Sequence, residues 1–193
     1  MGHCGKRRKQ VSVLKRMKPY IFVDLDETLI HTYEFWQKPT VDPVRVKVDD
    51  QIFKVRVRPG AKDFLATLRE IGEVRMLTVA IYNYAIKMNE TFNLGFDLGD
   101  IWAREHIQGG YTIDLEPADR VYLFDNLHVK QNRLKVNFLR PTVKDKVPTY
   151  IQVKEYLGTE EFPFDKEEIS RLIKKLNSPV LLKPNHKGTL GDW

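Results

Sequence analysis

The sequence predicts an α/β fold built on a central, largely parallel β-sheet flanked by helices. Short apolar runs that end in acidic residues occur at 20–25 and 121–124, and such runs are typical of strands buried on both faces of a parallel sheet. Segments with helical apolar spacing lie between them, and alternating strands and helices favour this class. Ligands of such sheets bind beyond the carboxyl ends of the strands, so both acidic ends should face one crevice.

A small β-hairpin is expected after the first strand. Residues 44–48 and 53–57 alternate apolar side chains with Arg or Lys, and the polar stretch 49–51 separates them. This pattern predicts two antiparallel strands with one buried face. We therefore expect a hairpin inserted into the α/β core.

The middle of the chain continues the alternation. Gly72 is expected to end a first helix that begins after Pro59-Gly60, with a stripe formed by Phe64, Leu65, Leu68 and Ile71. The elements expected next are a strand at 74–79, a helix at 82–92, and strands at 121–124 and 136–139.

The C-terminal part gives weaker signals. Residues 141–164 contain three prolines and are expected to be mostly irregular, whereas Asp165 and Glu168 form a capping box before an apolar helical stripe. The expected organisation is a basic arm at 1–18, a catalytic domain at 19–178 and a loose tail at 179–193.

Composition sets limits on the class of protein. The chain has 193 residues, of which 42% are hydrophobic, so it can bury an ordinary core and is not disordered throughout. Its single cysteine excludes an internal disulfide framework. No apolar run approaches the roughly 20 residues that span a bilayer, and no secretory signal is recognised. We expect an intracellular protein without a membrane span, in the cytoplasm or the nucleus.

The net charge of +6 is concentrated at one end. Seven basic residues and no acid lie in the first 20 residues, so the rest of the chain is nearly neutral. Such an arm suits nucleic acid, an anionic membrane or an acidic partner, and it resembles a nuclear-import cluster. A solvated terminus without a partner is the other interpretation.

The richest chemical segment follows the first strand. Asp24 and Asp26 have alternate spacing, so near a strand end both carboxylates can lie on one side. Paired carboxylates attract a hard cation such as Mg²⁺. One carboxylate can attack phosphorus, and a second can protonate the leaving oxygen and later activate water.

The chain resembles the haloacid-dehalogenase superfamily, and more closely the phosphatases of the RNA polymerase II C-terminal domain and their NIF-like relatives. The resemblance covers about residues 19–140. The matching segments, in order, are VDLDETLIHT (23–32), RPGAKDFLATL (58–68), LTVAIYNYA (77–85), AREH (103–106) and VYLFDN (121–126). It implies a Rossmann-like core and phosphatase activity.

The resemblance also implies roles for the two leading acids. Asp24 would be the nucleophile and a ligand of Mg²⁺. Asp26 would be the general acid and base, with its backbone carbonyl on the metal.

Further residues would surround the phosphoryl group. Thr78 would donate a hydrogen bond to it, and Arg104 would lie near it. Asp125 would hold Mg²⁺ with Asn126 beside it, and Thr28 would support the loop. Phosphoryl transfer depends chiefly on such positioning and charge neutralisation.

One position departs from the family pattern. Ile113 stands where the family usually carries a lysine that contacts the nucleophile and the phosphate. Losing such a contact costs roughly 2.7–4 kcal/mol of transition-state stabilisation. The chain is then either a poor enzyme or one that places another cation there, Arg104 first and Lys130 second. Tyr84 matches an aromatic position near the cleft, and helix packing is an equal alternative.

We therefore expect a Mg²⁺-dependent phosphomonoester hydrolase that works through an aspartyl-phosphate. Its substrate would be phosphoserine or phosphothreonine protein, or a small phosphomonoester. Two alternatives stay open. One is a weakened module that binds a phosphorylated ligand without turnover, and the other is a nucleic-acid end phosphatase that uses the basic arm.

Overall fold

The structure is a computed structural model, and it describes residues 18–107, 112–116, 120–127, 135–138 and 148–177. Almost all of the predicted basic arm and the whole of the predicted tail at 179–193 lie outside the described residues. The domain boundaries therefore stay predictions.

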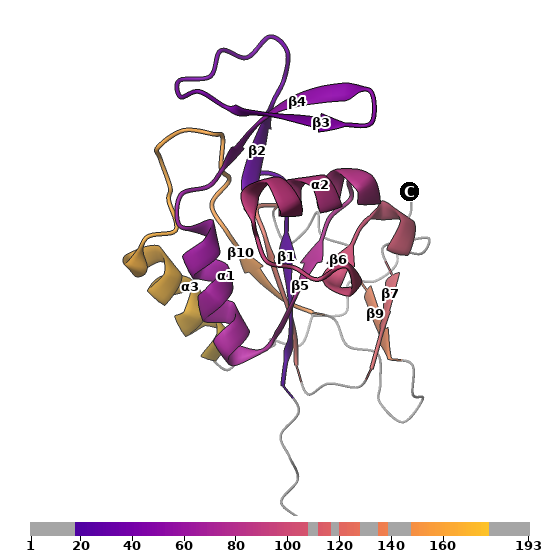
Figure 1. Ribbon diagram of the computed structural model, residues 1–193. Coiled ribbons are helices and arrows are strands. Elements are labelled where there is room, and N and C mark those ends of the chain that lie inside the picture. The colour runs from indigo at the N-terminus through magenta and orange to yellow at the C-terminus, as the bar shows by residue number, and fades with distance from the viewer. Residues whose placement is uncertain (1–17, 108–111, 117–119, 128–134, 139–147, 178–193) are drawn as a thin grey trace, which may run out of the picture.

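A five-stranded parallel sheet forms the centre, with the order β10-β8-β1-β5-β6 (Figure 1). Because all pairs are parallel, the carboxyl ends of the strands lie along one edge. The strands are β1 (Tyr20–Asp24), β5 (Glu73–Leu77), β6 (Ile101–Trp102), β8 (Val121–Asp125) and β10 (Thr149–Gln152).

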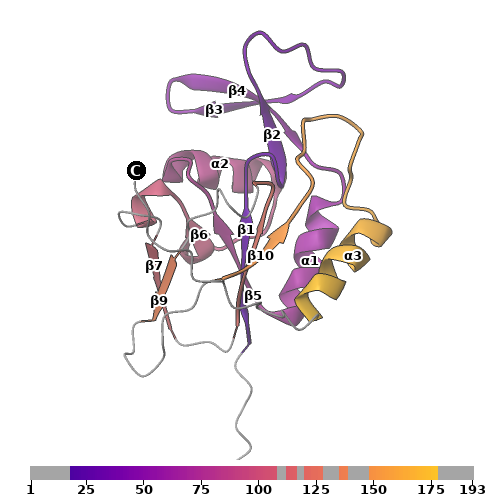
Figure 2. The same ribbon diagram turned by 180° about the vertical axis from the view of Figure 1, so that it is seen from behind.

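Different layers cover the two faces of this sheet. Ile21 and Val23 of β1 point into a core that includes the buried sides of α1 (Ala61–Ile71), α2 (Tyr82–Phe92) and α3 (Lys166–Asn177). Tyr20 and Phe22 point the other way, into a cluster that includes Ile113 and Leu115 of β7. The two-stranded parallel sheet of β7 (Thr112–Leu115) and β9 (Lys135–Phe138) lies on the opposite side from α1 and α3 (Figure 2).

The predicted hairpin is part of a three-stranded antiparallel sheet. β3 (Val44–Val48) and β4 (Gln51–Val57) form the hairpin, and β2 (Ile30–Tyr33) pairs with the other side of β4. Its inner residues Val46, Val48 and Val55 are buried in the same core as α2. We call this sheet the insertion; it stands above the carboxyl edge of the central sheet (Figure 1).

The predicted fold class is confirmed, and two details differ. β10 lies inside the segment expected to be mostly irregular, and β2 was not expected as a strand. Between β10 and α3 the chain forms a long connection, residues 153–165, which we call the strap; it runs beside the insertion and α1 (Figure 1). Two short 3₁₀ turns, Leu98–Asp100 and Arg104–His106, flank β6. Within the described residues no helix is long and apolar enough to cross a bilayer.

Candidate active site

A tight turn at the end of β1 presents the acidic segment. The backbone amides of Leu29 and Ile30 both donate to the carbonyl of Leu25, at 2.9 and 3.1 Å. Glu27 adopts a left-handed conformation, with φ of 60°. The side chains of Leu25 and Leu29 are fully buried, so the core anchors both sides of the turn. This geometry fixes Asp24 and Asp26 at the carboxyl edge of the sheet.

Asp24 lies among other acids. Burial raises the pKa of Asp24 well above its usual value, and the charges of Asp125 and Asp26 raise it further. Hydrogen bonds from the Thr28 side chain and the Leu25 backbone oppose this shift. Asp125 ends the neighbouring strand β8 and is 7% exposed. The structure thus brings together the two carboxylates that the sequence placed at the ends of separate strands.

Asp26 is held by hydroxyl groups. The Tyr84 hydroxyl donates to Oδ1 of Asp26 at 2.7 Å, and the Thr78 hydroxyl lies 3.4 Å from Oδ2. Thr78 directly follows β5, and its oxygen accepts a hydrogen bond from the backbone amide of Ala80 at 3.1 Å. Burial raises the pKa of the Asp26 carboxyl, and the bonds from Tyr84 and Thr78 work against that shift. Asp26 is therefore half-buried in a polar setting.

Tyr84 connects this site to the insertion. Its oxygen lies 2.7 Å from the Thr32 hydroxyl of β2. Because the single proton of Tyr84 goes to Asp26, the Thr32 hydroxyl must donate to Tyr84. Its ring also packs edge-on against Phe53 of β4, with centroids 5.3 Å apart. Tyr84 thus both packs and faces the cleft, a choice that the sequence left open; Thr32 carried no signal of its own.

The other side of the site is built around Asn126. Its side-chain oxygen lies 3.4 Å from the buried Thr28 hydroxyl, which links the β1 turn to the end of β8. The Tyr150 hydroxyl of β10 donates to the backbone carbonyl of Asp125 at 3.1 Å. Burial, Asp125 and Asp24 together raise the pKa of Tyr150. The sequence did not single out Tyr150, because it lies in the segment expected to be irregular.

A cleft of about 610 Å³ opens between the insertion and the start of α2. Asp26, Tyr84 and Arg104 line it. The Arg104 guanidinium donates to the backbone carbonyl of Val79 at 2.8 Å, which places this cation on the cleft wall. Apolar residues, among them Phe35, Ile52, Phe53 and Ile81, line the part that the insertion and α2 enclose.

Ile113 is a core residue. It is 1% exposed and packs with apolar side chains on the face of the central sheet that β7 covers. The second cation considered for this role, Lys130, lies outside the described residues.

A cation at this site would be bound by a small number of oxygen ligands. Within the described residues no group of three or more His, Cys, Asp or Glu side chains has the arrangement of a metal site. The predicted set requires two carboxylates, Asp24 and Asp125, with an amide and a backbone carbonyl. Hard divalent cations such as Mg²⁺ bind through one or two carboxylates and keep several waters, so the residues present fit that ion.

Comparison with known families places the site in context. The model of the NLI interacting factor-like phosphatase family matches residues 19–177. The chain belongs to this family. The matched range includes the β1 turn, the insertion, β8 and α3, so it contains every described residue of the candidate site.

Individual relatives match shorter parts or match weakly. Phosphatase PSR1 of Saccharomyces cerevisiae is 33% identical over 69 residues, which are 35% of this chain and 16% of that protein. An uncharacterized Schizosaccharomyces pombe protein is 33% identical over 70 residues, or 35% of this chain and 22% of its own length. The aligned segments thus span less than a quarter of these relatives.

One similar solved structure is that of Fcp1, which is described as an essential RNA polymerase II CTD phosphatase. It is 18% identical in sequence, with a TM-score of 0.47. The match covers 84% of this chain and 49% of that chain. A fission yeast Fcp1 variant bound to beryllium fluoride gives 19% identity and the same TM-score, over 84% of this chain and 51% of the other.

Proposed function

We propose that the chain is a Mg²⁺-dependent phosphomonoester hydrolase that works through an aspartyl-phosphate on Asp24. The main support is that Asp24 and Asp125 lie close together at the carboxyl edge of the sheet. Beside them, Tyr84 and Thr78 hold the side chain of Asp26. Membership of a phosphatase family supports the same activity.

A divalent cation suits the charge of this site. The charge of Asp125 and burial raise the pKa of Asp24, so the two carboxylates need a positive charge nearby to be ionised together. Asp24, Asp125, Asn126 and the backbone carbonyl of Asp26 would hold Mg²⁺. Bound there, the ion supplies charge neutralisation for the phosphoryl oxygens and favours the ionised form of the nucleophile.

The protein's own groups then carry the two chemical steps. A carboxylate oxygen of Asp24 attacks phosphorus, the ester P–O bond breaks, and Asp26 gives its proton to the leaving oxygen. Asp26 next takes a proton from water, the water oxygen bonds to phosphorus, and the bond between phosphorus and Asp24 breaks. The Tyr84 hydroxyl holds Asp26 in place for both transfers. Thr78 and Arg104 are proposed to contact the phosphoryl oxygens.

The substrate we propose is a phosphorylated serine or threonine in a polypeptide. The cleft beside Asp26 is large and partly apolar, and Phe35 on its rim is 86% exposed. Such a wall suits side chains next to a phosphorylated residue better than it suits a small, fully hydrated phosphate ester. Nucleic-acid binding by the basic arm stays a prediction, because residues 1–17 lie outside the described residues.

The test is hydrolysis of p-nitrophenyl phosphate with Mg²⁺ and with EDTA. We expect Asp24→Asn to lower kcat by at least about 10³-fold, because the amide is not a nucleophile. Asp63→Asn makes the same chemical change on an exposed turn of α1, and it should retain activity. Wild-type hydrolysis at background rate, or equal rates for wild type and Asp24→Asn, would contradict the proposed hydrolase activity.

Ile113 favours a second candidate, a module that binds a phosphorylated ligand without turnover. Its burial among apolar side chains means that this position supplies no charge to the phosphate. Binding of a phosphopeptide with no hydrolysis at any Mg²⁺ concentration would establish this candidate. Multiple turnovers per protein would exclude it.

A further inference from the structure

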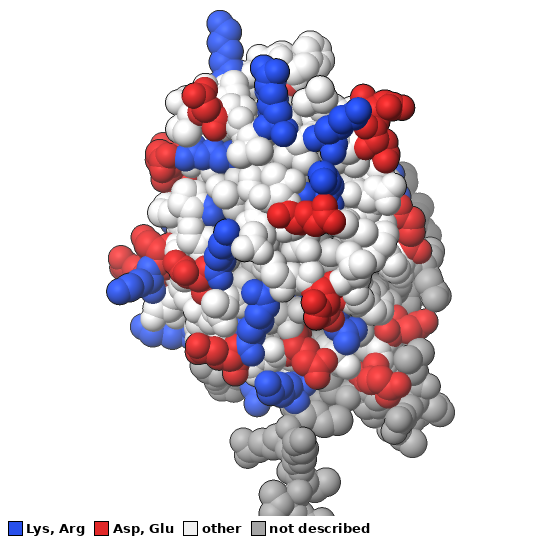
Figure 3. All heavy atoms as spheres, viewed as in Figure 1, with Lys and Arg blue, Asp and Glu red and all other residues white. Residues whose placement is uncertain are grey.

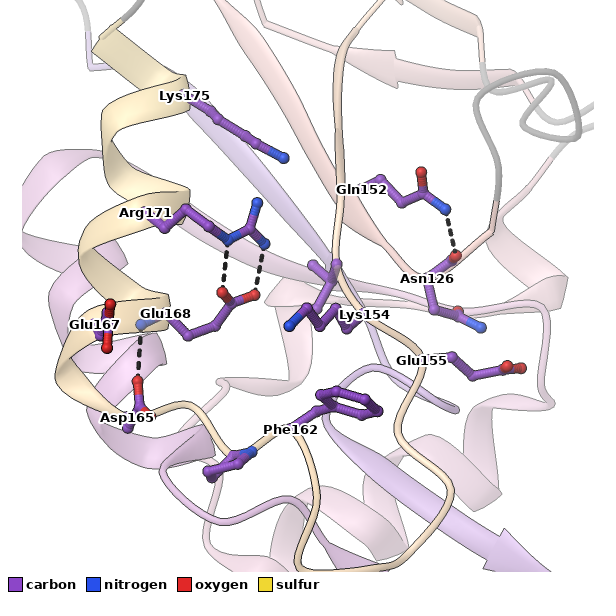
Figure 4. Close-up of a pocket in the computed structure, with 12 residues that line it drawn as sticks. Asn126, Gln152, Lys154, Glu155, Phe162, Asp165, Glu167, Glu168, Arg171 and Lys175 are labelled. Carbon is purple, nitrogen blue, oxygen red and sulfur yellow. Dashed lines mark hydrogen bonds and ion pairs between the residues drawn. The ribbon is translucent and has the colours of Figure 1, made fainter.

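A second groove, of about 760 Å³, lies on the other side of the site. It opens between the end of β10, the strap and the inward side of α3 (Figure 4). The central strand order places β10 on one side of β1, and β5 with the insertion-facing cleft on the other. The two hollows therefore flank Asp24 from opposite directions.

Three basic side chains extend into this groove, and its lining also includes four acidic residues, Glu155, Asp165, Glu167 and Glu168. Lys175 and Arg171 extend from α3 toward its centre, and Lys154 reaches in from the strap (Figure 4). Glu168 forms a bidentate pair with Arg171, with both bonds at 2.6 Å. Within the described residues no carboxylate lies at ion-pair distance from Lys154 or Lys175. Among the described residues, the two ammonium groups therefore have the more distant charge of Glu168 beside them but no direct ion pair.

The remaining acids do not neutralise the centre. Glu167 lines the rim of the groove on α3, and Glu155 points away from the helix (Figure 4). The carboxylate of Asp165 caps α3 by accepting the backbone amide of Glu168 at 2.8 Å. Burial lowers the pKa of Lys175, the nearby charge of Arg171 lowers it further, and the charge of Glu168 opposes this shift. An anion in the groove would relieve that repulsion.

Asn126 joins the groove to the active site. Its side chain lines the groove wall, and its backbone carbonyl lies 3.4 Å from the Gln152 amide nitrogen (Figure 4). Asn126 also follows Asp125 directly and contacts Thr28 of the β1 turn. A chain whose phosphate lies at Asp24 would therefore enter this groove as it leaves the site.

A buried arginine holds the groove in shape. Arg58 donates to the carbonyls of Lys154 and Phe162, at 2.8 and 2.7 Å, and to that of Thr28 at 3.2 Å. The Lys154 ammonium in turn lies over the Phe162 ring, 4.8 Å from its centroid. The groove wall and the β1 turn thus share one support. A preformed wall lowers the ordering cost of binding.

We propose that this groove binds acidic residues of the substrate polypeptide, on the side of the phosphorylated residue away from the insertion. The inference rests on the proposed function, and it adds a substrate preference to it. Lys154 and Lys175 supply the charge, and Asn126 and Gln152 line the wall next to the active site. A peptide fits better than a nucleic acid, because Glu168 inside the groove and the acids at its rim would repel a continuous row of phosphates.

The test compares two phosphopeptides of one sequence, with either Asp or Asn at the positions flanking the phosphoserine. Wild-type protein should show kcat/KM for the acidic peptide about 5- to 10-fold above that for the neutral one, mainly through KM. The double variant Lys154→Gln/Lys175→Gln should abolish this ratio. Lys166→Gln removes the same charge from α3 outside the groove, and the ratio should persist.

A binding measurement separates failure of the groove from failure of the enzyme. Fluorescence anisotropy with non-hydrolysable phosphonate versions of the two peptides measures their binding affinity even if no turnover occurs. Equal affinity of wild type for both peptides overturns the inference, as does an unchanged preference in the double variant. A lysine-dependent affinity for a labelled single-stranded oligonucleotide, without a peptide preference, also overturns it.

Discussion

Tyr84 holds the proposed general acid from a distant part of the chain. Its hydroxyl donates to Asp26 and accepts from Thr32, both at 2.7 Å, so one phenol joins α2, the β1 turn and the insertion. Burial and the nearby Asp26 charge raise the pKa of Tyr84, which keeps its proton available for this bond. The hydroxyl thus acts as a positioning group.

Removing this hydroxyl should affect substrates unequally. We expect Tyr84→Phe to lower kcat about tenfold or more for phosphoserine, whose alkoxide leaving group needs a proton. The loss should be small for p-nitrophenyl phosphate, because nitrophenolate leaves without one. Steady-state kinetics on both substrates measure the difference.

Tyr82 provides the matched control. It lies on the same helix, and its hydroxyl bonds the carbonyl of Leu98 at 3.0 Å, outside the acidic network. Tyr82→Phe should leave the ratio of the two rates unchanged. A Tyr84→Phe variant that loses the same factor on both substrates would show a general structural role instead.

Arg58 shows how a buried charge is accommodated by backbone carbonyls, with no ion pair to any carboxylate of the described residues. It is 1% exposed, and its guanidinium bonds three carbonyls and stacks over the Phe164 ring at 4.0 Å. Burial lowers the pKa of Arg58 to about 10, so it stays charged at neutral pH. The role of this arginine in holding the strap was not predicted, because a single Arg-Pro-Gly sequence does not reveal which carbonyls it meets.

The path of the strap depends on a single glycine. Gly158 has φ of 74°, and its carbonyl accepts bonds from the Tyr33 hydroxyl and from Arg56. A Cβ added there would lie 2.6 Å from Cζ of Tyr33 and 2.7 Å from Cδ2 of His31. The strap can therefore pass the insertion this closely only with glycine at this position.

Gly158→Ala should destabilise the protein by about 1–3 kcal/mol, through left-handed strain and overpacking. Urea unfolding measures the change in free energy. Gly99→Ala adds the same methyl group where no atom lies within 4 Å, and its cost should be small. Equal effects of both substitutions would mean that the strap does not pack as described.

The sequence predicted the strands and helices whose local residue pattern is sufficient to identify them. The apolar run of β1, the alternation of β3 and β4 and the stripe of α1 are each set by nearby residues, and the structure confirms them. β10 has only four residues, directly after Pro148. β2 overlaps the acidic segment 23–32, where no alternating strand pattern was recognised. Both become strands because a partner strand lies beside them, which local spacing does not encode.

For the whole molecule, the parallel topology decides where acidic charge gathers. β1 and β8 are adjacent and end in Asp24 and Asp125. The two carboxylates therefore lie close together at one edge of the sheet, where burial and the charge of Asp125 raise the pKa of Asp24. Elsewhere Lys and Arg side chains are interspersed with Asp and Glu on the visible surface (Figure 3). The acidic site is thus a local feature that the overall charge of +6 conceals.

This concentration of acids predicts a dependence on pH and Mg²⁺. The folded-state pKa values of Asp24 and Asp26 are raised, so above about pH 4 these two carboxyls bind more protons in the folded protein than in the unfolded chain. The free energy of unfolding in EDTA should therefore fall as pH rises from there toward those folded-state pKa values. At neutral pH, Mg²⁺ at about 100 times its Kd should raise Tm by about 5 °C or more.

Asp125→Asn tests the origin of both effects. It removes one repelling charge, so the fall of stability with pH in EDTA should become shallower and the Mg²⁺-induced rise in Tm should shrink. Thermal unfolding over pH 5–8, with and without Mg²⁺, measures both. Asp63→Asn should behave as wild type. A pH slope unchanged in Asp125→Asn would place the linked protons elsewhere.

The candidate site was predictable where residues follow strand ends. Asp24, Thr78 and Asp125 each come directly at or after a strand, and parallel pairing brings them to one edge. The groove beside α3 was not predicted, because Lys154 and Lys175 lie on different elements and meet only through the packing of Leu172 and Leu176 into the core. Their separation in sequence hides their common surface.

The strap is anchored on both sides of an exposed tip. Tyr156 donates its amide to the carbonyl of Glu27 before the tip, and after it Phe164 donates to Pro59 and stacks on Phe64 with centroids 4.2 Å apart. Glu160 and Glu161 between them are exposed. A peptide bond cleaved at this tip would leave each new end tied to the core, so the polypeptide offers a natural point for division into two fragments that reassemble around one active site.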